Sequence, residues 1–409
     1  MTDAAPPDLQ HDSRVRFVLE FGRALQLYGA AAHRLEEALE SCCLSLGLEG
    51  QFFATPTSVF CAFGSLDDQR VRLLRVNAGE VDLGKLTELY ELWGRVVAGR
   101  LRPADAAARV RGIVASPQPA PRALLLACQA AASGSAACFF GGRPLDILVA
   151  AALGLVVGML TFSQLRFARV RRVAGPAAAF LTAAAVTMLG TAHDFGRDLT
   201  IIASLILLVP GFTLTIAISE LAHGHLAAGT SRLMGAIMVF LSLTVGVALG
   251  VRVGGELLGV PLPQPLPQVL PWWATAAALL TASLCYVVLF HARPRDTGWI
   301  IATCAVSFYG ARLGSHALGA DMGVFLGAFL AGAVSNALAR GRGTPAAVTA
   351  LPGIIVLVPG SLGLRSLASL LEGQTLVGVN TAFAVFMIAC ALVTGLLLAN
   401  FLVPTRREL

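Results

Sequence analysis

The sequence Leu-Val-Pro-Gly occurs twice in the chain, at residues 208–211 and 357–360, each time in the middle of a long apolar stretch. Proline removes a backbone donor and clashes with the preceding helical turn, and glycine loosens the backbone that follows. Each stretch is therefore predicted to form a helix that is interrupted near its centre. In lipid the freed backbone groups need partners in protein or in a water-filled cavity, so the fold must enclose both breaks.

The two breaks belong to an internal repeat with a constant offset of 149 residues. Three flanking glycines recur at this offset: Gly224 as Gly373, Gly229 as Gly378, and Gly246 as Gly395. The sequence Arg-Pro-Leu-Asp at 143–146 is echoed by Arg-Pro-Arg-Asp at 293–296, within one residue of the same offset. Broken helices at corresponding positions of two halves are typical of secondary transporters, whose substrate site lies at the repeat interface.

The composition separates a polar segment from a membrane segment. Hydrophobic residues make up 56% of the chain and the mean hydropathy is +0.74, which is typical of a membrane protein. Residues 1–121 nevertheless contain 15 of the 24 acidic residues, whereas the remainder contains nine acids and 17 arginines. Because those arginines lie in short loops between apolar runs, the net charge of +6 does not indicate a nucleic-acid partner.

The polar segment is predicted to be a small α+β domain that ends in a stiff linker. Apolar residues at helical spacing predict a helix over 13–46, and residues 51–63 and 70–76 read as two or three strands. Helices are predicted again at 83–98 and 103–114, followed by the proline-rich linker 117–121. No apolar signal segment occurs at the N-terminus, so the domain is expected to stay in the cytoplasm.

Ten membrane spans are predicted, five in residues 122–253 and five in residues 271–409, joined by the proline-rich linker 254–270. Their approximate bounds are 122–141, 145–165, 173–191, 199–221, 231–251, 271–291, 298–317, 322–340, 346–371 and 375–403. The expected fold is thus an α-helical polytopic membrane protein preceded by a cytoplasmic domain. Five spans per half is an odd number, so the second half enters the membrane upside down and the two broken helices run antiparallel.

The arginines fix the expected orientation under the positive-inside rule. Eleven lie at predicted cytoplasmic ends: Arg166, Arg169, Arg171, Arg172, Arg232, Arg293, Arg295, Arg340, Arg342, Arg406 and Arg407. Three lie at predicted outer ends: Arg143, Arg197 and Arg252. The chain is therefore expected in the cytoplasmic (inner) cell membrane with both termini in the cytoplasm.

The breaks themselves are the predicted substrate site. A broken helix exposes amide donors at one half-helix start and carbonyls at the other half-helix end, which suits the carboxylate and ammonium groups of a small amino acid. The predicted binding residues are Pro210, Gly211, Thr213, Pro359, Gly360 and Ser361. A packing kink without a ligand is the alternative interpretation of each break.

Ionisable residues in or beside spans are further candidates, because such groups are costly in a membrane. The proton-coupling candidates flank the first broken helix: His193, Asp194, Asp198 and Glu220. The alternative is that these four residues lie in solvated loops and take no part in proton transfer. Asp146 and Asp296 each follow Arg-Pro at the start of a span, where a helix N-cap is favoured over a gating ion pair. Arg365, five residues after Pro359, is a structural or gating candidate that could also extend to the outer surface.

The chain resembles the threonine/serine exporter family of the ThrE type. The resemblance is carried by Gly29, by His-Arg-Leu-Glu-Glu at 33–37, by Pro-Thr at 56–57, by Asp-Leu-Gly-Lys-Leu at 82–86 and by both Val-Pro-Gly elements. It implies a fused two-module form that exports threonine and serine by proton-driven secondary transport. Split relatives of the family imply dicarboxylate export as an alternative. At position 33 the family often has an aromatic residue, where this chain has histidine.

Other classes of function have little support in the sequence. The eight cysteines show no Cys-x-x-Cys pair, so no metal site is expected, and no phosphate-binding loop indicates ATP drive. Neither a cofactor nor an enzymatic activity is expected. An intramembrane hydrolase using Ser133, Ser135 and His193 is a remote alternative. The expected partners are an amino acid, protons and the lipid bilayer, and a homo-oligomer is left open.

Overall fold

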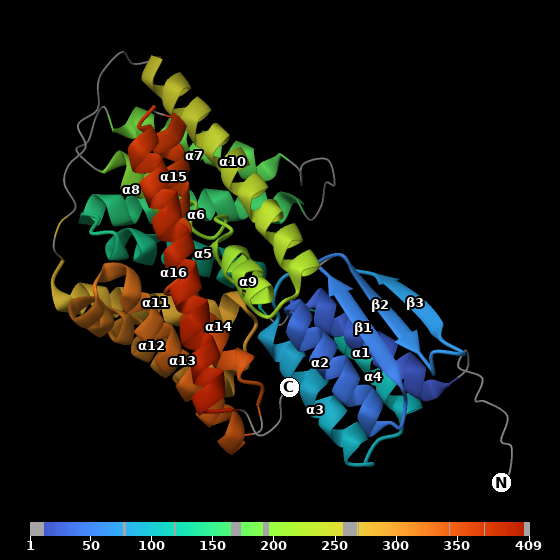
Figure 1. The fold of residues 1–409 in the computed structure, drawn as a ribbon. Helices are drawn as coiled ribbons and strands as arrows, with labels where there is room; N and C mark the ends of the chain where they lie inside the picture. Colours follow the sequence, from blue (N-terminus) through green and yellow to red (C-terminus); the bar gives the residue numbers. More distant parts are fainter. Residues whose placement is uncertain are drawn as a thin grey trace, which may run out of the picture.

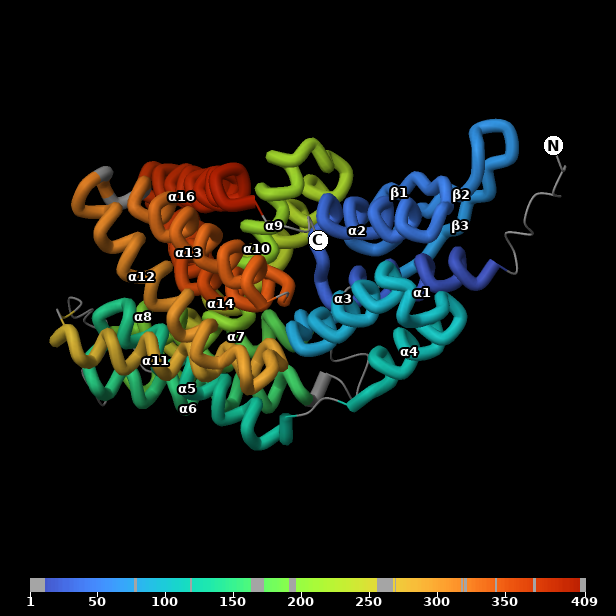
Figure 2. Tube along the Cα trace, turned by 90° about the horizontal axis from the view of Figure 1, so that it is seen from below, coloured from blue at the N-terminus to red at the C-terminus, as the bar shows by residue number. Residues whose placement is uncertain are grey.

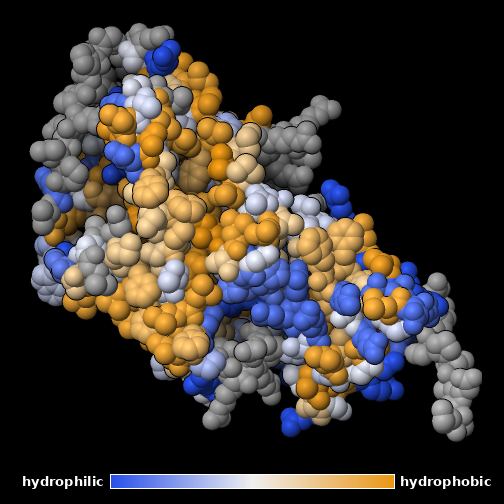
Figure 3. Space-filling view, in the orientation of Figure 1, coloured by the Kyte–Doolittle hydropathy of each residue, from blue (hydrophilic) through white to orange (hydrophobic). Residues whose placement is uncertain are grey.

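A computed structural model describes residues 12–76, 79–117, 120–164, 173–190, 196–256, 268, 270–342, 344–371 and 373–404. An N-terminal α+β unit lies at one end of a larger body of helices (Figures 1 and 2). Large apolar side chains are exposed over the helical body, including Leu148, Met238 and Phe383. Hydrophilic residues gather on the visible face where the body meets the N-terminal unit (Figure 3).

The N-terminal unit combines four helices with a three-stranded antiparallel sheet. Its elements are α1 (Ser13–Leu27), α2 (Ala32–Ser45), β1 (Gly50–Thr55), β2 (Ser58–Phe63), β3 (Arg70–Arg75), α3 (Leu83–Val97) and α4 (Pro103–Ala115). The alternation expected of strands puts Phe52, Val59 and Cys61 in the core and leaves Phe53 and Phe60 exposed.

One sequence expectation for this unit is wrong. Residues 13–46 were expected to form a single helix, but the chain turns between α1 and α2. Gly29 has a φ of +83° at this turn, a left-handed conformation that favours glycine and ends a helix. The three strands and the helices α3 and α4 lie where the pattern predicts them.

The helical body contains two interrupted helices. Its elements are α5 (Arg122–Phe139), α6 (Pro144–Gln164), α7 (Ala174–Leu189), α8 (Arg197–Ser204), α9 (Gly211–Ala222), α10 (Leu226–Glu256), α11 (Trp272–Leu289), the short 3-10 turn η2 (Pro294–Asp296), α12 (Thr297–Leu318), α13 (Ala320–Arg342), α14 (Ala347–Ile355), α15 (Gly360–Leu371) and α16 (Thr375–Leu402). The chain is interrupted between α8 and α9 and between α14 and α15, at the two Pro-Gly elements.

Seven segments of the described chain are long and apolar enough to cross a membrane, with α14 and α15 counted together. The chain is therefore a polytopic helical membrane protein. The total of ten spans stays a prediction, because α7 and α9 are apolar but shorter than the helices counted as long enough to cross a membrane. Four of the arginines behind the predicted orientation, Arg166, Arg169, Arg171 and Arg172, lie outside the described residues, as do Arg406 and Arg407.

The two halves pack their helices in the same pairs. Helix α7 packs along α10 as α13 packs along α16, and α9 packs on α10 as α15 packs on α16. A Cβ on Gly229 would meet Leu221, and one on Gly378 would meet Leu370, which is the same contact displaced by 149 residues. Small residues let membrane helices approach closely, so the repeated glycines mark repeated helix contacts.

The two broken helices run in opposite directions relative to the N-terminal unit. The end of α9 lies against this unit, because the backbone N–H of Ala32 donates to the Glu220 carboxylate at 2.9 Å. By contrast, α14 begins beside the unit, where Leu351 packs against its core. The unit also holds the end of α11, since the N–H groups of Leu83 and Gly84 donate to the carbonyls of Phe290 and His291.

Candidate functional site

The two Pro-Gly breaks lie directly against each other. A Cβ on Gly211 would come within 3.0 Å of the Gly360 Cα and would clash with the Val358 side chain. A Cβ on Gly360 would come within 2.8 Å of Val209 Cγ1 and 3.4 Å of the Gly211 Cα. Glycine is therefore required by this close approach, and the crossing point joins the two halves of the molecule.

Two half-helices begin at this crossing. Helix α9 starts at Gly211 and α15 starts at Gly360, so both present the positive end of a helix dipole there. Helices α8 and α14 end nearby and present carbonyl groups. Half-helix starts and half-helix ends thus lie around one point, and the binding role expected of the breaks stays a prediction.

The crossing does not, however, line either of the two cavities described below. Pro210, Gly211, Thr213, Pro359, Gly360 and Ser361 are absent from both linings. At the crossing the glycines allow the two backbones to pack directly against each other. Thr213 and Ser361 are half-buried, and the nearby Thr215 hydroxyl donates to the Gly211 carbonyl at 3.2 Å.

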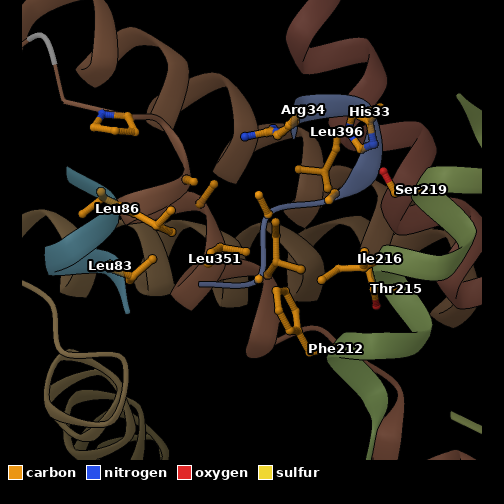
Figure 4. A pocket seen from close by; sticks show the side chains of 18 of the residues that line it. His33, Arg34, Leu83, Leu86, Phe212, Thr215, Ile216, Ser219, Leu351 and Leu396 are labelled. Atoms are coloured by element: carbon orange, nitrogen blue, oxygen red, sulfur yellow. The ribbon is translucent and has the colours of Figure 1, made fainter. Parts of the chain in front are cut away.

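One cavity lies between the N-terminal unit and the body, and we call it the junction cavity. Its volume is about 120 Å³. Arg34 and His33 of α2 enter it opposite Phe212, Thr215 and Ser219 of α9, as Figure 4 shows. Its other walls are largely apolar residues of α3, α14 and α16.

A second, larger cavity of about 1010 Å³ lies beyond the crossing, and we call it the far cavity. It is lined by Ile201 and Ile202 of α8, by Leu364 and Arg365 of α15, and by residues of α10. Its charged lining residues are Arg143, Asp146, Arg197, Asp198, Arg252 and Arg365. The Arg365 guanidinium lies 5.6 Å from the centre of the Phe140 ring. The crossing thus separates two cavities on opposite sides of the broken helices.

Asp146 does not cap its helix in the way the sequence suggested. It is the third residue of α6 rather than the N-cap, and its carboxylate accepts the Arg143 N–H at 2.6 Å. The same carboxylate accepts the Gly196 N–H at 2.7 Å and the Thr200 hydroxyl at 3.4 Å. Asp146 is therefore a buried link between the starts of α6 and α8.

Asp296 stands at the N-cap position of α12, but its carboxylate caps no backbone N–H. It is 3% exposed and lies 3.5 Å from the Arg342 guanidinium at the end of α13. The favoured N-cap role is wrong here. Asp296 itself has helical backbone geometry, which turns its side chain away from the first backbone N–H groups of α12. An ion pair is observed instead, and the gating role suggested for it stays a prediction.

The proton-coupling candidates fall into three different settings. His193 and Asp194 lie outside the described residues. Asp198 is half exposed and pairs with its neighbour Arg197 at 2.9 Å. Glu220 is fully buried where α9 meets the N-terminal unit, and it pairs with Arg232 of α10 at 2.9 Å.

A histidine cluster surrounds this contact, and the sequence analysis did not find it. The rings of His33 and His223 stack in parallel with their centres 4.0 Å apart, and the His225 ring lies 6.0 Å from His33. His225 also lies 3.5 Å from the Glu36 carboxylate. The partners are about 190 residues apart in the chain, so only their shared residue type could have indicated the cluster.

We expect this contact to weaken as the pH falls. Burial, with the positive charges nearby, lowers the pKa of His33 to about 3. Below pH 6.5 the unfolded unit binds a proton that the folded unit rejects, so the free energy of unfolding should fall by about 1.4 kcal/mol per pH unit. Thermal unfolding of the full chain between pH 7.5 and 5 measures this slope.

The His33→Phe variant keeps an aromatic ring stacked on His223 but cannot bind a proton, so it should lose most of this pH dependence. The control variant, His316→Gln, changes an exposed histidine on α12 and should keep it. The other charged and titratable groups near His33 are those of His223, His225, Glu36, Arg34 and Arg232, and all of them are kept in both variants. An unchanged slope in His33→Phe would show that His33 is not the group responsible.

Comparisons with known proteins cover both halves of the chain. Residues 16–254 match the family model ThrE, described as "Putative threonine/serine exporter", and residues 275–402 match a second model, described as "Threonine/Serine exporter, ThrE". No solved structure matches the chain.

Similar curated proteins are found in fungi. An uncharacterized protein of Schizosaccharomyces pombe is 27% identical over 391 residues, which is 90% of this chain and 50% of the relative. Pheromone-regulated membrane protein 10 of Kluyveromyces lactis is 31% identical over 242 residues, 57% of this chain and 25% of the relative. The protein of the same name from Candida albicans is 26% identical over 374 residues, 88% of this chain and 33% of the relative. The chain thus spans half or less of the length of these relatives.

Proposed function

Because the chain belongs to the threonine/serine exporter family, we propose that it is a secondary transporter that moves threonine and serine out of the cytoplasm. The observation that carries this proposal is the crossing of two antiparallel broken helices between two cavities. A transporter needs such a barrier, with access from one side at a time. The ten spans, the cytoplasmic membrane and the cytoplasmic N-terminal unit are parts of this proposal.

The substrate is proposed to bind at the crossing when the two halves move apart. The starts of α9 and α15 then offer backbone N–H groups to the carboxylate, and the ends of α8 and α14 offer carbonyls to the ammonium group. Thr213 and Ser361, each close after a break, are proposed to contact the side-chain hydroxyl.

The driving force is proposed to be the proton gradient, with an acidic residue near the first broken helix as the proton carrier. Asp198 faces the far cavity and is half exposed, so it can exchange protons with the solution there. Asp194, which precedes Asp198 closely in the sequence, stays a second candidate for the proton carrier. Glu220 is less suited, because its carboxylate is fixed by the N–H of Ala32 and by Arg232.

One observation favours the alternative, a dicarboxylate exporter. The far cavity contains four arginines and two aspartates, and Asp146 is already bonded to three donors. A surplus of guanidinium groups attracts anions more than zwitterions.

Counterflow in proteoliposomes distinguishes the two functions. We expect vesicles preloaded with threonine to accumulate labelled threonine and serine, and vesicles preloaded with succinate to accumulate little labelled succinate. Empty liposomes and protein inactivated by heat are the controls. Rapid counterflow of succinate without counterflow of threonine would show that the chain is a dicarboxylate exporter and not a threonine/serine exporter. An inward proton gradient should accelerate threonine release if protons drive export.

A further inference from the structure

The junction cavity has a chemical character that neither the family nor the proposed function accounts for. Among its lining residues are a guanidinium (Arg34), an imidazole (His33), two hydroxyls (Thr215 and Ser219) and an amide (Asn400), set in apolar walls. No acidic side chain lines it. A cavity with one positive charge, hydroxyl groups and apolar walls is complementary to a small carboxylate.

Arg34 makes the cavity a built site rather than a gap in the packing. The residue is half-buried on α2, and within the part of the chain that the structure describes it has neither a hydrogen bond nor an ion pair. A partly buried guanidinium without a partner is costly, so an anion placed beside it is stabilised by a charge-assisted, bidentate contact. Figure 4 shows the Arg34 side chain extending into the cavity from the N-terminal unit.

His33 gives an independent sign of a missing ligand. The residue lines the same cavity and is 7% exposed, and its Nδ1 atom has no hydrogen-bond partner among the described residues. Buried polar atoms are nearly always satisfied, so this nitrogen is expected to gain a partner when the cavity is filled.

Resting on the proposed function, we propose that the junction cavity is a carboxylate-binding site through which the N-terminal unit holds the transported solute at the entrance to the broken helices. Arg34 binds the carboxylate. Ser219 and Thr215 offer hydroxyl groups to the remaining polar groups, and the apolar walls of α14 and α16 contact the carbon chain. The cavity, of about 120 Å³, suits a small solute.

The N-terminal unit is held over this site by both halves of the body. Arg232 of α10 bonds to the Ala30 carbonyl and to Glu220, while Arg293 bonds to Glu91 of α3 at 2.6 Å. Movement of one half relative to the other therefore shifts Arg34 relative to α9. The site is assembled only while both contacts are in place.

The test measures both binding and sided transport with the full chain. Titration of the purified protein with L-threonine, L-serine and succinate gives Kd values, and uptake into everted vesicles gives KM from the face of the N-terminal unit. We expect Arg34→Ala and Arg34→Gln to raise Kd and this KM for the bound solute about tenfold or more, since each loses a hydrogen bond to a charged group. Arg34→Lys should keep part of the affinity.

Arg23→Ala, which removes an exposed arginine from α1, is the matched control and should behave as wild type. KM measured from the opposite face should be unchanged in every Arg34 variant, which a misfolded protein would not show. The solute whose Kd responds identifies the source of the carboxylate, either the amino acid or the dicarboxylate.

Wild-type Kd and KM in both Arg34→Ala and Arg34→Gln would overturn the site and leave the proposed function standing. If the wild-type vesicles take up none of the three solutes, the proposed function itself is wrong. If they take them up but no solute binds with a dependence on Arg34, only the present inference is wrong.

Discussion

Gly211→Ala is expected to stop transport almost completely while the protein still inserts and folds. The added Cβ would clash with Val358 and lie 3.0 Å from the Gly360 Cα, which belongs to the backbone and cannot rotate away. Overpacking costs about 1–3 kcal/mol, which reduces the population of the sealed state by roughly five- to 150-fold. Threonine counterflow and leak of preloaded threonine measure the loss of exchange and of the seal.

The matched control is Gly235→Ala on α10, where a Cβ would meet nothing within 4 Å. This variant should transport at the wild-type rate. Adding Val358→Ala to Gly211→Ala removes the nearest clashing group and should restore part of the activity. Replacing Pro210 together with Gly211 would be a less clear test, because it changes the break and the clash at once. Wild-type exchange by Gly211→Ala would show that the tight crossing is not part of the transport cycle.

Glu220→Ala is expected to be the most destabilising of the single changes to the acidic candidates. The carboxylate is fully buried, and its removal leaves the buried Arg232 guanidinium, 10% exposed, without its charge partner. Breaking a buried pair in this way costs about 3–5 kcal/mol. Thermal unfolding and proteolysis of the N-terminal unit should both show the loss, since the same carboxylate accepts the Ala32 N–H.

Two further variants separate this structural role from proton coupling. Combining Glu220→Leu with Arg232→Met removes both charges and should recover much of the stability, as replacement of buried pairs by apolar residues often does. Asp198→Asn, at a half-exposed surface pair, should change stability by less than about 1 kcal/mol. If Glu220→Gln has wild-type stability and loses only proton-driven export while it retains exchange, then Glu220 is a coupling residue after all.

Much of the secondary structure could be predicted from the sequence because its causes are local. Runs of apolar residues predict where the helices of the body lie, and proline with glycine predicts where the second half-helices begin, at Gly211 and Gly360. Alternation predicts the three strands. The turn at Gly29 was missed because the apolar pattern continues through it, although the glycine itself was the signal for a break.

The candidate site was predictable only in part. The internal repeat placed two breaks in equivalent positions, and the repeat of helix contacts at an offset of 149 residues agrees with that reading. The partners of the charged residues were not predictable. Asp146 bonds to Gly196, Asp296 pairs with Arg342, and Glu220 bonds to Ala32, which lies 188 residues away in the chain.

By itself, then, the sequence determined the class of protein, the helices and the two breaks, since hydropathy and backbone chemistry act within a few residues. The tertiary structure alone decided that Gly211 seals against Gly360 and that Arg34 of the N-terminal unit enters a cavity beside α9. Contacts of this kind depend on how whole helices pack and on where a separate unit docks. A linear pattern of apolar and polar residues leaves both open, because many pairings of the same faces bury similar apolar area.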